Sequence, residues 1–216
     1  IFWVNWRTGS PTQILMEGGE VTSVEEIGCP PGTTIEVRDL FYNLPARRKF
    51  LKGVRSESAY IIEVVTRMAL IQAQVSFSLK HNNRVLFQLP PTQDERSRLR
   101  TILGKDVASH LVRVEGTEDE MVARGWATDS RYCRGSSKGI YCYVNGRYIR
   151  DKLIIHAIRE AYRRFIPAKM YPVVVLSLSV PFSDVDVNVH PTKLEVRFRQ
   201  GDRIHRLVGH MLRDVL

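Results

Sequence analysis

The 216-residue chain is poor in cysteine, contains no Cys-x-x-Cys pair and has no long apolar run. Its three cysteines are Cys29, Cys133 and Cys142. An odd, sparse set of this kind excludes a disulfide framework and a cysteine-based zinc site. We therefore expect reduced, partly buried thiols in a cytosolic or nuclear protein.

No apolar segment reaches the ~18 residues of a membrane-spanning helix, so no membrane partner is expected. The first residue is Ile1, residues 1–4 resemble the middle of a strand, and no signal-peptide pattern follows. We expect that further sequence precedes this chain in its parent protein. Hydrophobic residues make up 44% and charged residues 25%, which is typical of a folded globular protein and argues against disorder.

Positive charge is abundant and unevenly distributed. The net charge is +9, with +2 in residues 1–90 and +7 in residues 91–216. The segment from Arg131 to Lys169 contains ten basic residues and only two acidic ones, Asp151 and Glu160. Clustering of this kind is typical of a surface that binds a polyanion. Charge alone leaves a merely solubilising surface as an equal alternative.

Hydrophobic periodicity predicts an α+β protein made of two domains in series. In the first ninety residues, Pro45 opens a short helix over 46–52, and a longer helix follows over 57–73. Alternation predicts strands over 75–79 and 85–89. Pro90-Pro91 then marks a domain boundary.

The second half begins with a capping-box spacing at Thr92 and Glu95, which predicts a helix ending at Leu103. Asn145-Gly146 is a strong hairpin signal, and Asp151 is a suitable N-cap for a helix reaching about residue 165. The remaining elements that we predict are strands over 111–115, 120–127, 140–144, 147–149, 173–180, 185–189 and 194–198, a polar loop over 129–139, and a final helix from residue 202.

Three segments carry a resemblance to a known family. They are residues 32–51 (GTTIEVRDLFYNLPARRKFL), 141–147 (YCYVNGR) and 186–198 (DVNVHPTKLEVRF). Their sequences and order resemble those of the MutL family of DNA mismatch repair proteins. The resemblance extends from about residue 30 to the end of the chain.

The resemblance implies a fold and a function. Residues 1–90 would be the C-terminal portion of a gyrase-like (GHKL) ATPase domain, and residues 91–216 a ribosomal-protein-like α+β domain that binds DNA. The parent would be a nucleotide-switched clamp, either a homodimer or a paralogous heterodimer. Its partners would be DNA without sequence preference, a mismatch-recognition protein, and a downstream nuclease or helicase. A bacterial parent would be cytoplasmic or nucleoid-associated, and a eukaryotic one nuclear.

By the same resemblance, Thr33 and Thr34 contact the nucleotide, and Lys193 reaches the γ-phosphate from the second domain. Threonine hydroxyls can both donate and accept hydrogen bonds, and lysine is a compact charge on a flexible stem. Without the resemblance, Gly-Thr-Thr reads simply as the start of a strand. The intact parent would bind ATP and Mg²⁺, whereas tight binding of either is not expected here.

For DNA binding we select five basic residues at or near the hairpin and the helix after it. They are Arg147, Arg150, Lys152, Arg163 and Arg164. They would act mainly on phosphates, which gives weak sequence preference and strong salt dependence. Tyr141, Tyr143 and Tyr148 lie in the same region; packing within the sheet is favoured over base stacking for them.

By the same resemblance, we expect the family's catalytic glutamate, Mg²⁺-binding asparagine and glycine-rich lid to lie upstream of this chain. We therefore predict no catalytic residue here, and no ATP hydrolysis above that of a Lys193→Ala control. No metal site is predicted either, because the histidines are scattered and His205 and His210 are five residues apart on one helix. Two alternatives to the mismatch repair protein are kept, a type II topoisomerase ATPase fragment and a plain nucleic-acid-binding module.

Overall fold

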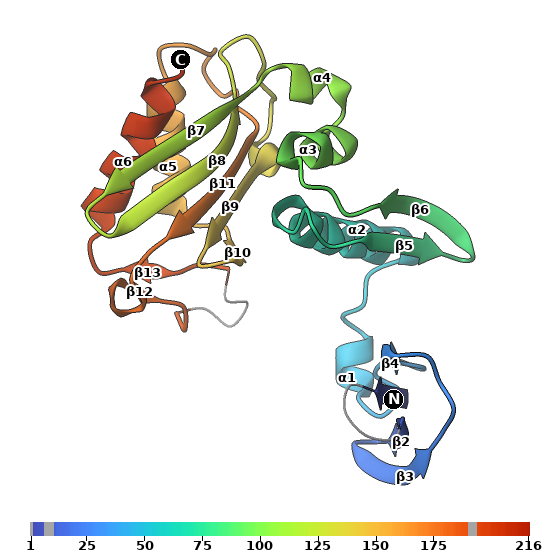
Figure 1. The fold of residues 1–216 in the computed structure, drawn as a ribbon. Helices are drawn as coiled ribbons and strands as arrows, with labels where there is room; N and C mark the ends of the chain where they lie inside the picture. Colours follow the sequence, from blue (N-terminus) through green and yellow to red (C-terminus); the bar gives the residue numbers. More distant parts are fainter. Residues whose placement is uncertain (1, 7–10, 190–193) are drawn as a thin grey trace. The chain divides into compact units, whose positions relative to one another are not determined.

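The protein is described from a computed structural model, which covers residues 2–6, 11–189 and 194–216 (Figure 1). The chain forms two compact units, Ile1–Ala59 and Tyr60–Leu216. Among the described residues, no helix has both the length and the apolar character needed to cross a bilayer. The architecture is α+β, as predicted.

The first unit contains an antiparallel sheet with the strand order β3-β2-β1-β4. Its strands are β1 (Phe2–Trp6), β2 (Thr12–Glu17), β3 (Glu20–Glu26) and β4 (Gly32–Glu36). Helix α1 (Pro45–Arg48) is shorter than the predicted helix over 46–52. No side chain described between residues 11 and 59 is buried, and Phe50 is 84% exposed. This unit therefore has no closed apolar core within the described residues.

The second unit begins within helix α2 (Val54–Ile71) and continues as the hairpin of β5 (Phe77–His81) and β6 (Arg84–Leu89). The prediction of a helix and two strands here is confirmed, with shifted ends. Asn82 and Asn83 form the hairpin turn, with φ of 46° and 60°. Helices α3 (Glu95–Leu103) and α4 (Lys105–Ser109) follow.

The predicted capping box at the start of α3 is wrong. Asp94 is the N-cap, and its carboxylate accepts a hydrogen bond of 2.9 Å from the main-chain N–H of Arg96. The Thr92 hydroxyl instead accepts a hydrogen bond of 3.1 Å from the N–H of Asp94. Asp94, two residues after Thr92, provides a negatively charged acceptor, and negative charges are stabilised at the N-terminal, positive end of a helix dipole.

A five-stranded sheet with the order β10-β9-β11-β8-β7 forms the centre of the second unit. Its strands are β7 (Leu111–Glu118), β8 (Met121–Thr128), β9 (Ile140–Val144), β10 (Arg147–Ile149) and β11 (Val174–Ser179). Only the β9–β11 pair is parallel. Strand β7 extends beyond the predicted end at residue 115 and includes Gly116, and Asp119, with φ of 53°, lies in the turn to β8. A Cβ at Gly116 would lie 2.9 Å from the Cβ of Met211, so the position has no room for a side chain.

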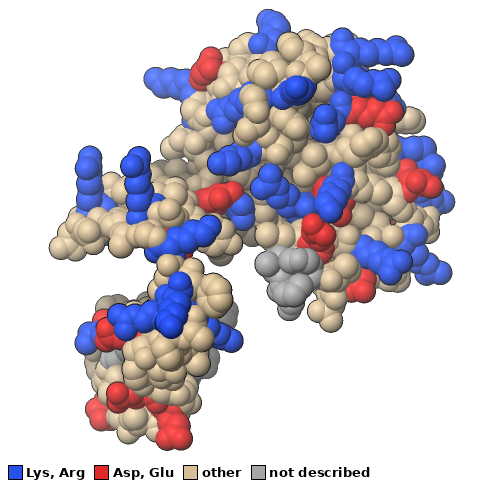
Figure 2. All heavy atoms as spheres, turned by 180° about the vertical axis from the view of Figure 1, so that it is seen from behind, with Lys and Arg blue, Asp and Glu red and all other residues tan. Residues whose placement is uncertain are grey.

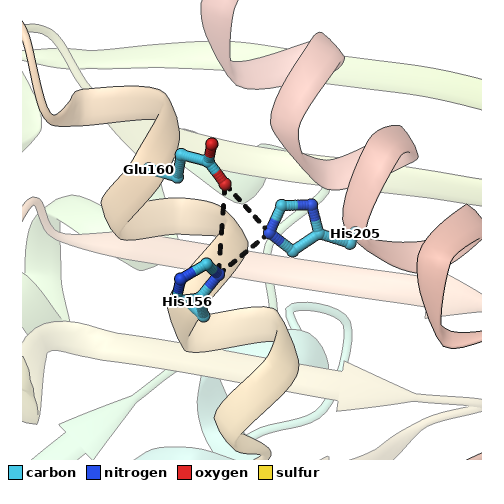
Figure 3. A group of neighbouring side chains, drawn as sticks. All are labelled: His156, Glu160 and His205. Atoms are coloured by element: carbon cyan, nitrogen blue, oxygen red, sulfur yellow. Dashed lines mark hydrogen bonds and ion pairs between the residues drawn. The ribbon is translucent and has the colours of Figure 1, made fainter.

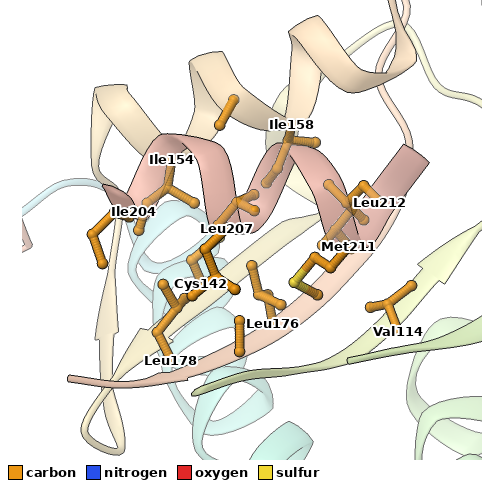
Figure 4. Close-up of a cluster of buried hydrophobic side chains, with 14 of the residues drawn as sticks. Val114, Cys142, Ile154, Ile158, Leu176, Leu178, Ile204, Leu207, Met211 and Leu212 are labelled. Atoms are coloured by element: carbon orange, nitrogen blue, oxygen red, sulfur yellow. The ribbon is translucent and has the colours of Figure 1, made fainter. Parts of the chain in front are cut away.

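Helices α5 (Lys152–Tyr162) and α6 (Gly201–Arg213) pack side by side on one face of this sheet (Figure 1). Their apolar stripes meet the strands in the main core, where Ile154, Ile158 and Leu212 have no exposed surface (Figure 4). A second apolar cluster includes Leu70, Leu99 and Tyr143. The predicted strands over 185–189 and 194–198 shorten to β12 (Val185–Asp186) and β13 (Arg197–Phe198), which pair with each other.

Candidate functional site

The β9–β10 hairpin and the start of α5 present three of the predicted DNA-binding residues. The hairpin turns at Asn145 and Gly146, with φ of 49° and 79°, as their sequence predicts. Arg147, Arg150 and Lys152 are all exposed around this hairpin. The carboxylate of Asp151 caps α5 by accepting hydrogen bonds from Leu153 and Ile154 at 2.9 and 3.2 Å.

The other two predicted residues lie at the opposite end of α5. Arg163 is the C-cap residue, Arg164 comes directly after it, and both are exposed. A helix of 11 residues is about 16 Å long, so one phosphate cannot contact both of its ends. The five candidates therefore form two groups, one at each end of the helix.

Further basic residues, not selected from the sequence, extend this surface. The Arg150 guanidinium lies 3.3 Å from the Ser137 hydroxyl, which brings residues 137–138 beside the hairpin. Arg134 pairs through its main chain with Tyr171, and Arg159 lies over the Tyr171 ring at 5.4 Å. The loop predicted over 129–139 is thus tied to the rest of the unit. The sequence signal for these residues was the same basic segment.

Lys and Arg side chains are spread over much of the second unit on the face that Figure 2 shows, with smaller groups of Asp and Glu between them. None of the salt bridges between described residues involves Arg147, Arg150 or Lys152, so these three side chains are not neutralised by an ion pair. We define the basic surface as Arg134, Lys138, Arg147, Arg150, Lys152, Arg159, Arg163 and Arg164.

The three tyrosines of this region pack within the protein, as expected. Tyr143 is 1% exposed, and its ring meets that of Tyr148 edge-on at 5.6 Å. Burial raises the pKa of the Tyr143 and Tyr148 hydroxyls, and also that of Tyr141. These side chains therefore support the sheet and do not form a stacking platform for bases.

The nucleotide candidates Thr33 and Thr34 lie on β4, opposite Asn5 and Val4 of β1. They line an open pocket of about 380 Å³, together with Ile27, Cys29, Pro30, Pro31 and Gly32. The pocket offers hydroxyl groups and apolar walls, which suit the base of a nucleotide. Among the described residues that line it, none has a cationic side chain for phosphates. Lys193, the predicted phosphate ligand, lies outside the described residues.

The chain is similar to DNA mismatch repair proteins in both sequence and structure. Residues 99–216 match the family model of the DNA mismatch repair protein, C-terminal domain. The chain is 40% identical to the DNA mismatch repair protein MutL of Citrifermentans bemidjiense over 95% of its length, and 40% identical to that of Haemophilus influenzae strain PittGG over 91%. It spans 32% of each of these relatives, about a third of their length.

Solved structures show the same fold. A crystal structure of the N-terminal domain of a DNA repair protein matches with a TM-score of 0.81 at 21% identity, covering 99% of this chain and 70% of that one. The Aquifex aeolicus MutL ATPase domain complexed with ADP matches with a TM-score of 0.66 at 24% identity, covering 96% of this chain and 72% of that one. The 43K ATPase domain of Thermus thermophilus gyrase B is more distant, with a TM-score of 0.51 at 13% identity, covering 100% of this chain and 63% of that one. By its sequence matches, the chain belongs to the MutL family of DNA mismatch repair proteins.

Proposed function

We propose that this chain is the part of a MutL-type mismatch repair protein that binds DNA and contributes to an ATP site. The observation that carries the proposal is the exposed basic surface along α5 and β10, in a chain 40% identical to MutL proteins. The parent would act as an ATP-switched dimeric clamp that couples mismatch recognition to downstream repair factors.

The chemistry of the basic surface favours contacts with the DNA backbone. Guanidinium groups bind phosphate oxygens through two parallel hydrogen bonds, and lysine adds a point charge. The DNA-binding candidates lie at both ends of an 11-residue helix. A separation of about 16 Å allows them to contact several phosphates. Binding would then depend on geometry and salt and not on base sequence.

For the nucleotide, Thr33 and Thr34 would supply hydroxyl groups to the base end of ATP, and Lys193 a positive charge to its terminal phosphate. ATP with Mg²⁺ supplies the phosphate-transfer chemistry and the switch in the parent. The pocket around Thr33 and Thr34, with no cation among its described lining residues, supports a partial site in this chain. The proposed domains are an ATPase portion over 1–90 and a DNA-binding domain over 91–216.

DNA binding is tested by fluorescence anisotropy with a labelled duplex across a salt series. The variant is Arg147→Glu with Arg150→Glu. Its matched control is Lys80→Glu with Arg84→Glu, an equal charge change at exposed positions of the β5–β6 hairpin. We expect a steep decrease of affinity with salt, flattened by about one unit of slope per lost phosphate contact in the first variant only. Equal effects of the two reversals would contradict the assignment.

The nucleotide proposal is tested by ATP hydrolysis and by binding of a fluorescent ATP analogue. We expect the unaltered chain to hydrolyse ATP no faster than its Lys193→Ala variant. Hydrolysis above that variant would show a complete site and overturn the prediction of an inactive fragment. Alanine at Thr33 and Thr34 should weaken any analogue binding, and an unchanged affinity would exclude both hydroxyls.

A further inference from the structure

Two histidines and a glutamate converge on the outer side of α5 and α6. By helical spacing, His156 and Glu160 lie on the same face of α5 as Lys152 and Arg164. His156 Nδ1 lies 3.0 Å from His205 Nε2, and Glu160 Oε2 lies 3.2 Å from that same nitrogen and 4.0 Å from His156 Nδ1. Figure 3 shows the side chains from the two helices pointing toward one another. We propose that His156, Glu160 and His205 form a binding site for a divalent transition metal, Zn²⁺ in the first instance.

Helical geometry and core packing place these groups together. His156 and Glu160 are four residues apart on α5 and therefore share one face. His205 is contributed by α6, whose apolar stripe packs with that of α5 in the main core through Ile158 and Leu207. Because the ligands project from two packed helices, the positions of their main-chain atoms are held by the scaffold before any metal binds.

The donor atoms fit the coordination geometry of zinc. With bonds of about 2.0–2.1 Å in a tetrahedron, ligand atoms lie about 3.3–3.4 Å apart. The observed separations of 3.0, 3.2 and 4.0 Å bracket that value. His156 and Glu160 have side chains 70% and 44% exposed, so a small rotation can close the longest separation. Two imidazoles and one carboxylate leave a fourth position for water.

Hydrogen bonding alone satisfies these atoms poorly. His205 Nε2 is close to Glu160 Oε2 and to His156 Nδ1, which carries a lone pair when the proton of that ring is on Nε2. A ring nitrogen carries at most one hydrogen, which cannot point well at both neighbours. A cation between the three atoms interacts with all of their lone pairs at once. Imidazole donors favour Zn²⁺, Ni²⁺ or Cu²⁺ over Mg²⁺ and Ca²⁺, which prefer oxygen ligands.

The neighbouring arginines of α6 are engaged elsewhere. Arg203 Nη1 lies 2.8 Å from Asp119 Oδ2, and Arg206 Nη2 lies 2.8 Å from Glu118 Oε1. The ion pairs found for Glu160 are both with histidines. Its carboxylate thus remains directed at the proposed metal position. A bound ion would link α6 to α5.

The site is tested with the whole 216-residue chain, free of any polyhistidine tag, titrated with Zn²⁺ in a calorimeter and with Co²⁺ by visible absorption. The variants are His156→Ala, His205→Ala and Glu160→Gln. The matched control is His210→Ala, which replaces an exposed histidine on α6, the helix that carries His205. All four replaced side chains lie outside the apolar core, and circular dichroism verifies that the variants are folded.

We expect one Zn²⁺ per chain and tetrahedral Co²⁺ absorption without a sulfur charge-transfer band, which excludes the cysteines. Either histidine variant should lower the affinity by about 10- to 100-fold or more, since even residues behind a metal ligand have effects of that size. The His210→Ala variant should bind as the unaltered chain does. Absence of stoichiometric binding, or binding that survives the loss of both His156 and His205, would overturn the proposal.

Discussion

The hydroxyl group of Tyr143 on β9 donates a hydrogen bond of 2.6 Å to the main-chain carbonyl of Arg67 on α2. The Arg67 guanidinium lies over the ring of Tyr148 at 4.2 Å. These contacts attach the second half of α2 to the five-stranded sheet. The compact unit therefore begins at Tyr60, although Pro90-Pro91 suggested a boundary thirty residues later. The family domain boundary near residue 90 remains a proposal.

Replacing Tyr143 with phenylalanine should lower the free energy of unfolding by about 0.5–1.5 kcal/mol, because the partly buried hydrogen bond to the Arg67 carbonyl is lost. Urea unfolding followed by circular dichroism measures the change. Tyr60→Phe is the control, because it removes the same hydroxyl group from a side chain that is 56% exposed. Equal small effects of the two replacements would show that the Tyr143 hydrogen bond contributes little.

Arg98 should be essential for the junction between α2, the β5–β6 hairpin and α3. It is 2% exposed, and its Nη2, which carries two hydrogens, lies 2.7–2.8 Å from the carbonyl oxygens of Ala73, Val75 and Pro90. Arg98→Met leaves three carbonyls without this donor, so we expect a loss of about 3 kcal/mol or more in unfolding free energy. Arg100→Met, at an exposed position of the same helix, should change it by less than about 0.5 kcal/mol. A mild Arg98→Met phenotype in urea unfolding would mean that water replaces the guanidinium.

Asp151 should make the protein more stable as pH falls. Burial raises the pKa of its carboxyl group, so the folded state binds that proton more tightly than the unfolded state does. Its contribution is fully present below the unfolded pKa of about 3.9 and is lost as pH rises through the higher folded pKa. Asp151→Asn, a neutral cap, should therefore gain stability relative to the unaltered chain as pH rises from 4 to 7.

Asp94→Asn is the control of opposite sign. A hydrogen bond with the Ser97 side chain is the main cause that lowers the pKa of Asp94. Its contribution is present above the unfolded pKa and is lost as pH falls through the folded one. That variant should lose stability relative to the unaltered chain as pH rises. Denaturation curves at several pH values that shift in parallel for both variants would refute this linkage.

Thiol reactivity should distinguish the three cysteines. Cys142 lies in the main core, and burial raises its thiol pKa to about 12. Cys29 and Cys133 are half-buried and free. With a chromogenic disulfide at pH 8, we expect two thiols to react in the native protein and the third only after denaturation, since the thiolate is the reactive form. Rapid reaction of all three in native buffer would indicate that the β9 region opens readily.

The local elements and the family could be predicted from residues that are close together in the chain. The apolar repeats of α5 and α6, the Asn145-Gly146 turn and the Asp151 cap depend on residues a few positions apart, so they can be read from the chain. The basic segment was likewise evident from composition. Cap selection at α3 was misjudged because Thr92 and Asp94 are both good acceptors, and only the path of the main chain selects Asp94.

Which distant residues contact one another could be learned only from the folded structure. Three features depend on contacts between segments far apart in sequence. They are the placement of β11 between β9 and β8, the close approach of Met211 to Gly116, and the burial of Arg98. His156 and His205 are 49 residues apart, and nothing local relates them. Periodicity shows which face of each helix is apolar, but packing of the two helices on one sheet determines which polar side chains become neighbours.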